Sequence, residues 1–277
     1  MRVRFGAELA SGRRMAPVFL RSTTVHRAAR AAIATLALLA HCGRAEIQPV
    51  EVHQVLQLDG REKVVALTLD ACGGGYDAAL IKFLKQHRIP TTIFATKKWM
   101  DHQPAAVAEL RAHPDLFAIE DHGERHIPAV LGAGRTVYGL RGNADAGHLK
   151  REVSGGAEAI RVATGIAPTW YRGATGEYDP QALTIISQLG YQVAGFSLNA
   201  DDGARLSRKQ ILLRLARVKS GDIIIAHMNR PDSDTAEGLA EGLQGLLDKG
   251  FRFVTLRGAR VKYASDTARV LARTAHP

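Results

Sequence analysis

Residues 64–74 read VVALTLDACGG, an apolar run that leads into an acid and two glycines. The apolar and β-branched residues Val64 to Leu69 predict a buried β-strand. Asp70 follows where that strand ends, and Gly73 and Gly74 favour a turn that allows close approach of a substrate or backbone. A carboxylate in this position is able to accept a proton from water or bind a metal ion. The commoner role of such an Asp is to cap the next helix.

Six further segments have the same strand character, and helical patterns separate them. They are Thr91 to Ala95, Leu116 to Glu120, Thr169 to Tyr171, Gln192 to Leu198, Asp222 to Ala226 and Phe251 to Leu256. Amphipathic stretches such as Ala78 to Gln86 and Lys209 to Val218 lie between them, and Gly190 and Gly250 predict helix ends. Residues 129–147 are Gly-rich and predict a long loop. The alternation predicts β/α units with about seven strands in a parallel sheet.

Polar side chains stand at the carboxyl ends of five of these strands. They are Asp70, His122, Arg172, Asp202 and His227. In a parallel barrel such positions meet at the rim where chemistry takes place. We therefore expect these five side chains to share one site.

The strongest local signal is residues 120–126, EDHGERH. His122 and His126 are four residues apart and are able to face one metal ion, although surface histidines also occur at this spacing. Arg172 enters a loop of small residues, where it is able to hold a carboxylate through two hydrogen bonds or simply lie on the surface. His227 ends an apolar strand, and a carboxylate beside it would raise its pKa.

Taken in order, these segments resemble the NodB-like polysaccharide deacetylases, the fourth carbohydrate esterase family, over roughly residues 62–256. The resemblance implies an α/β fold, a distorted seven-stranded (β/α) barrel. It also implies a metal-dependent hydrolase that removes N-acetyl groups from amino sugars of a polysaccharide. Peptidoglycan, a chitin-like oligomer and poly-N-acetylglucosamine all remain open as substrates.

The resemblance assigns Asp70 as the catalytic base and His122 and His126 as ligands of a divalent metal, with zinc expected. Ala71 stands where the family has a metal-binding aspartate, so the third ligand is missing. Its candidates are Asp121, Asp70, Glu124 and Cys72. Asp121 is the preferred one, because a small buried residue in a turn is the commoner role for a cysteine such as Cys72.

The remaining site residues follow from the same resemblance. Arg172 orients Asp70, and the backbone N–H of Thr175 meets the developing oxyanion. Asp202 holds His227, which protonates the leaving amine, and Ile225 packs against the acetyl methyl group. Gly203 stands where the family has a tryptophan.

Two other functions remain open at this point. Ala71 and Gly203 are compatible with a degenerate barrel that binds a glycan without cleaving it, and the fold also suits a hydrolase of a small non-sugar amide. The retained acids, histidines and arginine favour cleavage. No feature of the sequence specifies an oligomeric state.

Residues 1–45 predict an export signal. They contain eight Lys/Arg and one Asp/Glu, so their removal lowers the formal charge from +10 to 10 − (8 − 1) = +3, which removes the argument for a nucleic-acid partner. The apolar run Ala31 to Ala40 is too short to span a bilayer and suits an export signal. We expect the catalytic domain at residues 46–263, a loose tail at 264–277, and a periplasmic or extracellular mature protein without a membrane span.

Overall fold

The computed structural model describes residues 48–265 and 267, so the predicted export signal lies outside the described residues. Its main sheet contains eight strands, and every pair in it is parallel. The strand order is β11 (Gln192–Val193), β9 (Trp170–Tyr171), β5 (Phe117–Asp121), β4 (Thr91–Ala95), β3 (Val64–Ala71), β13 (Ile223–His227) and β12 (Leu198–Asn199). The eighth strand, β14 (Arg252–Val254), pairs with the first residues of β3.

The barrel closes through one continuous stretch of chain. Residues 192–199 begin as β11, which pairs with β9 at one edge of the sheet, and end as β12, which pairs with β13 at the other edge. The sequence predicts a single strand over Gln192 to Leu198, and the structure breaks it into these two short pieces. The predicted seven-stranded distorted barrel is thus confirmed, with the distortion located in this stretch.

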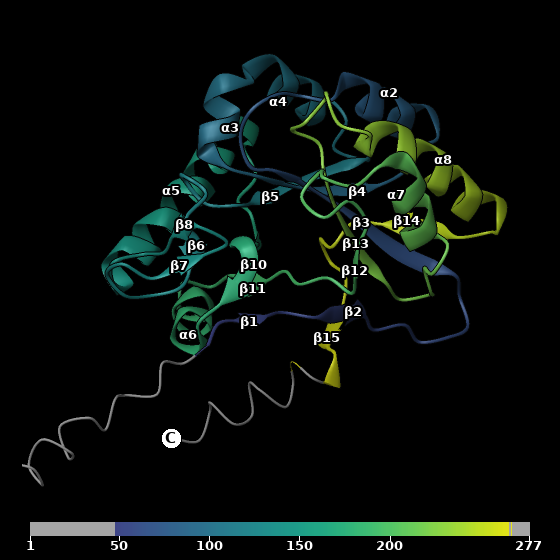
Figure 1. Ribbon diagram of the computed structural model, residues 1–277. Coiled ribbons are helices and arrows are strands. Elements are labelled where there is room, and N and C mark those ends of the chain that lie inside the picture. The colour runs from purple at the N-terminus through teal and green to yellow at the C-terminus, as the bar shows by residue number, and fades with distance from the viewer. Residues whose placement is uncertain (1–47, 266, 268–277) are drawn as a thin grey trace, which may run out of the picture. The chain divides into compact units, whose positions relative to one another are not determined.

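Seven helices of the described chain flank the strands. They are α2 (Ala78–Gln86), α3 (Lys97–His102), α4 (Pro104–Arg111), α5 (Ala146–Thr164), α6 (Pro180–Gln188), α7 (Arg208–Leu215) and α8 (Thr235–Asp248). Figure 1 shows α2, α7 and α8 together on the right, with α3, α4 and α5 on the left. None of the helices within these residues is long and apolar enough to cross a membrane.

The central strand β3 is buried on both faces, as expected for a strand between two parallel neighbours. Its alternate side chains Val65, Leu67, Leu69 and Ala71 pack outward against the helices. Val64 and Ala66 pack inside the barrel, and Asp70 continues that inward series because strand side chains alternate with a period of two. The residues that alternate along β3 therefore decide which polar groups reach the interior.

Short strands outside the main sheet form three smaller sheets. A three-stranded sheet joins β1 (Val50–Glu51), β10 (Ala174–Tyr178) and β6 (Pro128–Ala129), and a second sheet pairs β2 (Gln54–Leu56) with β15 (Val261–Tyr263). The predicted loop over residues 129–147 contains a hairpin, β7 (Thr136–Val137) with β8 (Leu140–Arg141).

Thr267 is buried and its hydroxyl accepts a hydrogen bond from the backbone N–H of His53 at 2.9 Å. The packed structure therefore extends past the predicted start of the tail at residue 264.

Candidate active site

Asp70 and His227 lie side by side on two paired strands. Asp70 is the penultimate residue of β3, His227 is the last residue of β13, and they are direct partners in the parallel register. Both line a cavity of about 310 Å³, together with Cys72, His126 and Ile225. The structure therefore brings these polar residues from the ends of two strands into one site, as predicted.

Asp70 is held by a buried arginine. Nη1 of Arg172 donates to Oδ1 of Asp70 at 2.8 Å and to the hydroxyl of Thr68 at 2.9 Å, while Nη2 donates to the carbonyl of Gly195. The guanidinium also lies 4.2 Å from the ring centroid of Phe94. Burial raises the pKa of Asp70, but attraction to Arg172 and the neighbouring histidines outweighs it and lowers the pKa below its usual value. Asp70 is therefore a buried carboxylate that stays ionised.

Asp201, one residue before the predicted Asp202, holds His227. Oδ1 of Asp201 lies 2.9 Å from Nδ1 of His227, and Oδ2 accepts the backbone N–H of His227 at 2.8 Å. Burial lowers the pKa of His227, but the hydrogen bonds to Asp201 and Cys72 outweigh it and hold the pKa well above its usual value. The assignment of Asp202 to this role is wrong. Asp202 lies at the cavity edge and pairs with Arg205 at 3.0 Å.

The physical reason is a turn at the end of β12. The side chain of Asn199 accepts the backbone N–H of Asp202 at 2.8 Å, and Asp202 itself has a φ of 53°, which places it in the left-handed region. This turn directs Asp201 into the protein, where it is fully buried. In a pair of adjacent acids, the local turn decides which one reaches the histidine.

His122 and His126 lie together as predicted, with ring centroids 4.9 Å apart. Nδ1 of His122 lies 2.6 Å from the carbonyl oxygen of Arg172. Because a carbonyl only accepts, this nitrogen carries the proton, and Nε2 is left for the site. Nε2 lies 3.4 Å from Sγ of Cys72 and 3.7 Å from Oδ2 of Asp70.

Cys72 supplies the third group near the two histidines. Its Sγ and one ring nitrogen of each histidine lie within 4.8 Å of one another. Burial raises the pKa of the Cys72 thiol, but the histidines outweigh it and hold the pKa well below its usual value. Cys72 is therefore not a small residue buried in a turn, because its side chain lines the cavity beside both histidines. Ala71 is fully buried against the helices, so the strand places residues 70 and 72, and not residue 71, in the site.

Asp121 faces away from the histidines, so its assignment as the third ligand is also wrong. Its Oδ1 accepts the backbone N–H of Gly123 at 2.8 Å, and a Cβ added to Gly156 of α5 would lie 2.1 Å from that oxygen. Burial raises the pKa of Asp121 well above its usual value, which favours the neutral acid. Glu124 likewise lies against Gly155 of the same helix.

Sequence reasoning missed Glu152, which supports the loop that carries His126. Its Oε1 accepts the backbone N–H groups of Arg125 and Ile127, both at 3.0 Å. Glu152 is buried on the inner face of α5, between Leu149 and Val153. A lone carboxylate on the apolar face of a predicted helix is the signal that could have identified it.

Thr175 and Ile225 both line the cavity, as the resemblance implies. Thr175 has a φ of 74°, a strained conformation for a β-branched residue. Its hydroxyl is buried without a hydrogen-bond partner in the described chain. Backbone strain of this kind is concentrated at binding sites and active sites.

Residues 57–194 match the family model described as polysaccharide deacetylase. The chain belongs to the polysaccharide deacetylase family. No curated protein matches the chain.

Solved structures share its fold at low sequence identity. The family 4 carbohydrate esterase PdaA of Bacillus subtilis is 22% identical, with a TM-score of 0.60 over 75% of this chain and 84% of that one. The Bc1960 peptidoglycan N-acetylglucosamine deacetylase is 22% identical, with a TM-score of 0.61 over 74% and 90%. A family 4 pseudoenzyme of Bacillus anthracis, BA3943, is 19% identical, with a TM-score of 0.57 over 71% and 65%. These likenesses establish the deacetylase fold. They do not establish the activity, which has to be argued from the residues of the site.

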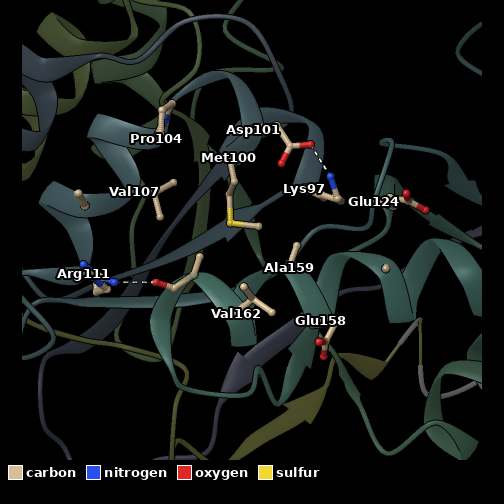
Figure 2. Close-up of a pocket in the computed structure, with 13 residues that line it drawn as sticks. Lys97, Met100, Asp101, Pro104, Val107, Arg111, Glu124, Glu158, Ala159 and Val162 are labelled. Atoms are coloured by element: carbon tan, nitrogen blue, oxygen red, sulfur yellow. Dashed lines mark hydrogen bonds and ion pairs between the residues drawn. The ribbon is translucent and has the colours of Figure 1, made fainter.

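A larger groove of about 650 Å³ lies elsewhere on this deacetylase domain, between α3, α4 and α5. Figure 2 shows its apolar lining by Met100, Val107 and Val162. Lys97 pairs with Asp101 at 2.5 Å across one end. The groove lacks the histidines and the thiol of the barrel rim, so the chemistry belongs to the smaller cavity.

Proposed function

We propose that this protein is a metal-dependent hydrolase that removes N-acetyl groups from amino-sugar residues of a polysaccharide. The observation that carries the proposal is the pairing of Asp70 with His227, each held by a buried group of opposite charge. Arg172 keeps the acid ionised, and Asp201 keeps the histidine protonated. Two titratable groups whose pKa values are pushed apart in this way suit a general base and a general acid at one pH.

A divalent metal fits the residues beside this pair. Cys72, His122 and His126 offer a sulfur and two ring nitrogens that lie within 4.8 Å of one another, and these donor types suit zinc. Three protein ligands would leave one coordination position open, as in catalytic zinc sites. When bound, the metal supplies positive charge that polarises a carbonyl and acidifies water.

Asp70 accepts a proton from the water that attacks the acetamide carbon. Its second oxygen, Oδ2, is the one nearer to His122, while Oδ1 is occupied by Arg172. Arg172 therefore fixes the carboxylate and leaves one oxygen for proton transfer. Both groups are buried, so the attraction between them is screened little by water.

His227 donates a proton to the leaving nitrogen, so that the amine departs as a neutral molecule. Asp201 occupies Nδ1, so the transfer is made by Nε2, the ring nitrogen on the side of Cys72. Ile225 offers an apolar surface for the acetyl methyl group, and the backbone at Thr175 offers an N–H to the developing negative charge. These last two roles rest on the position of both residues in the cavity lining.

Acetate release tests the proposal against its two alternatives. Zinc-loaded protein is incubated with peptidoglycan, with N-acetylglucosamine oligomers and with a small non-sugar amide. Acetate from the glycans supports the proposal. Glycan binding without acetate release would support a binding barrel, and acetate from the small amide alone would support the other hydrolase.

We further propose that the mature protein is exported and begins near Glu46. The basis is the arginine-flanked apolar run within residues 1–45. N-terminal sequencing of the native protein after cell fractionation tests it. An intact terminus in the cytoplasmic fraction would contradict it.

A further inference from the structure

Tyr138 is an exposed aromatic residue at the edge of the active-site cavity. It is 78% exposed, yet it contributes to the cavity lining together with Thr175 and His227. Of the large apolar side chains that are exposed in the described chain, Tyr138 alone lines this cavity. Single exposed aromatic side chains are common on protein surfaces, so it is the position of Tyr138 in the cavity lining, and not its exposure, that distinguishes it.

The backbone of Tyr138 is strained. Tyr138 and Gly139 form the two-residue turn between β7 and β8, because Val137 pairs with Leu140 in antiparallel register. Both turn residues have positive φ, 48° for Tyr138 and 80° for Gly139, which is the pattern of a type I′ turn. Asn, Asp or Gly is the favoured residue at the first position, and a bulky side chain with positive φ is an outlier there. The chain thus keeps a tyrosine where a smaller residue would be more stable, which indicates a functional role.

The tyrosine is also tethered on the site side. Its hydroxyl donates to Oε1 of Glu177 at 3.0 Å. Glu177 lies on β10, two residues after Thr175. The hydrogen bond therefore links the tip of the hairpin to the strand that carries a cavity residue, which restricts the motion of an otherwise free ring.

An aromatic face beside this cavity suits a sugar ring. The face of an aromatic ring carries negative potential and attracts the C–H bonds on one side of a pyranose ring. Gly203, which also lines the cavity, has no side chain to contact a sugar. We propose that Tyr138 is a stacking platform for the sugar next to the one that is deacetylated, so that the protein prefers oligomers of N-acetylglucosamine to the monomer. This inference rests on the proposed function for the identity of the reacting sugar.

Binding of the N-acetylglucosamine tetramer tests the platform separately from catalysis. Calorimetry is carried out on zinc-loaded protein in the Asp70→Asn background, in which turnover is suppressed. We expect Tyr138→Ala and Tyr138→Asn to weaken tetramer binding roughly tenfold, as loss of an aromatic contact commonly does, and Tyr138→Phe to weaken it less than threefold. Leu140→Ala is the matched control, because it removes another exposed apolar side chain from the same hairpin.

Thermal unfolding supplies a second readout that a purely structural role would not produce. Tyr138→Asn places a residue that tolerates positive φ in the turn, so we expect its Tm to rise by about 2 °C or more while tetramer affinity falls. If Tyr138→Ala binds the tetramer as tightly as the parent, or if Tyr138→Phe loses as much affinity as Tyr138→Ala, the platform is wrong. Failure of the parent to bind the tetramer would also overturn it. Absence of acetate release with retained, Tyr138-dependent binding would instead contradict the proposed function alone.

Discussion

Oδ1 of Asp201 lies 2.9 Å from Nδ1 of His227, and the neighbouring acid, Asp202, pairs with Arg205 at the surface. The second oxygen of Asp201 is also occupied, by the backbone N–H of His227 and the hydroxyl of Thr235. Both oxygens of the carboxylate are therefore engaged, which fixes the position and the charge of the ring.

Replacement of this carboxylate should change the pH dependence of the reaction. His227 has to be protonated to act as a general acid, and Asp201 raises its pKa, so kcat falls as the pH rises through that pKa. In Asp201→Asn the charge is lost and the pKa is lower, so we expect the alkaline limb of the kcat profile to move to lower pH and kcat to fall at least about tenfold at neutral pH. Asp202→Asn serves as the control, with an unchanged limb. A shifted limb in Asp202→Asn and an unchanged one in Asp201→Asn would reverse the assignment.

Cys72 should be required for metal binding. Removal of one of three protein ligands in Cys72→Ala should weaken zinc affinity by about a hundredfold or more, as measured by competition with a chelator. Cobalt(II) gives a second readout, because a thiolate ligand produces a charge-transfer band. We expect that band in the parent protein and expect its loss in Cys72→Asp, which keeps a metal ligand. Undiminished zinc affinity in Cys72→Ala would show that another residue completes the site.

Ala71→Asp should fail to improve metal binding. Residue 71 is buried against the helices, so a carboxylate there would lie in an apolar environment and cost about 2 to 4 kcal/mol of unfolding free energy. Urea titration measures this cost, with Ala71→Ser as the smaller polar control. Tighter zinc binding in Ala71→Asp would instead mean that residue 71 faces the histidines.

Glu152→Gln should loosen the histidine loop. An amide has one acceptor oxygen, so it cannot replace both carboxylate oxygens that accept the N–H of Arg125. We expect zinc affinity to fall about tenfold and the unfolding free energy to fall by about 1 to 2 kcal/mol. Glu158→Gln lies on the same helix but on its exposed face, paired with Arg161, and should change neither quantity. Equal zinc affinity in the two variants would show that Glu152 does not position the histidine loop.

The strands could be predicted because they are apolar runs between turns and helices. The range Thr91 to Ala95 was predicted to the residue, and Ala78 to Gln86 matches α2 at both ends. The closure of the barrel was not predictable, because the break within residues 192–199 depends on pairing with two distant strands.

The site was predictable as a set of strand ends but not in its details. Asp70, His122, Arg172 and His227 follow directly from polar residues at those ends, and His126 follows from its spacing of four residues from His122. The choice of Asp201 over Asp202 depends on a turn stabilised by Asn199, and the choice of Cys72 over Ala71 depends on the alternation of side chains along β3. In the sequence, Asp121 and Glu124 are plausible ligands, but in the structure their carboxylates pack against α5. The first two choices depend on local geometry at the strand ends, and the last depends on the packing of α5, a distant segment that spacing along the chain does not reveal.

The central claim is that the rim of the barrel removes acetyl groups with Asp70 as base, His227 as acid and a bound metal. Its most direct test is a paired measurement of acetate and free amine from N-acetylglucosamine oligomers and peptidoglycan. We expect equal amounts of the two products from zinc-loaded protein, little of either after chelation, and recovery when zinc is returned. We expect losses of about a hundredfold or more in Asp70→Asn and His227→Ala. Product formation at the parent rate in either variant, or unaffected by chelation, would contradict it.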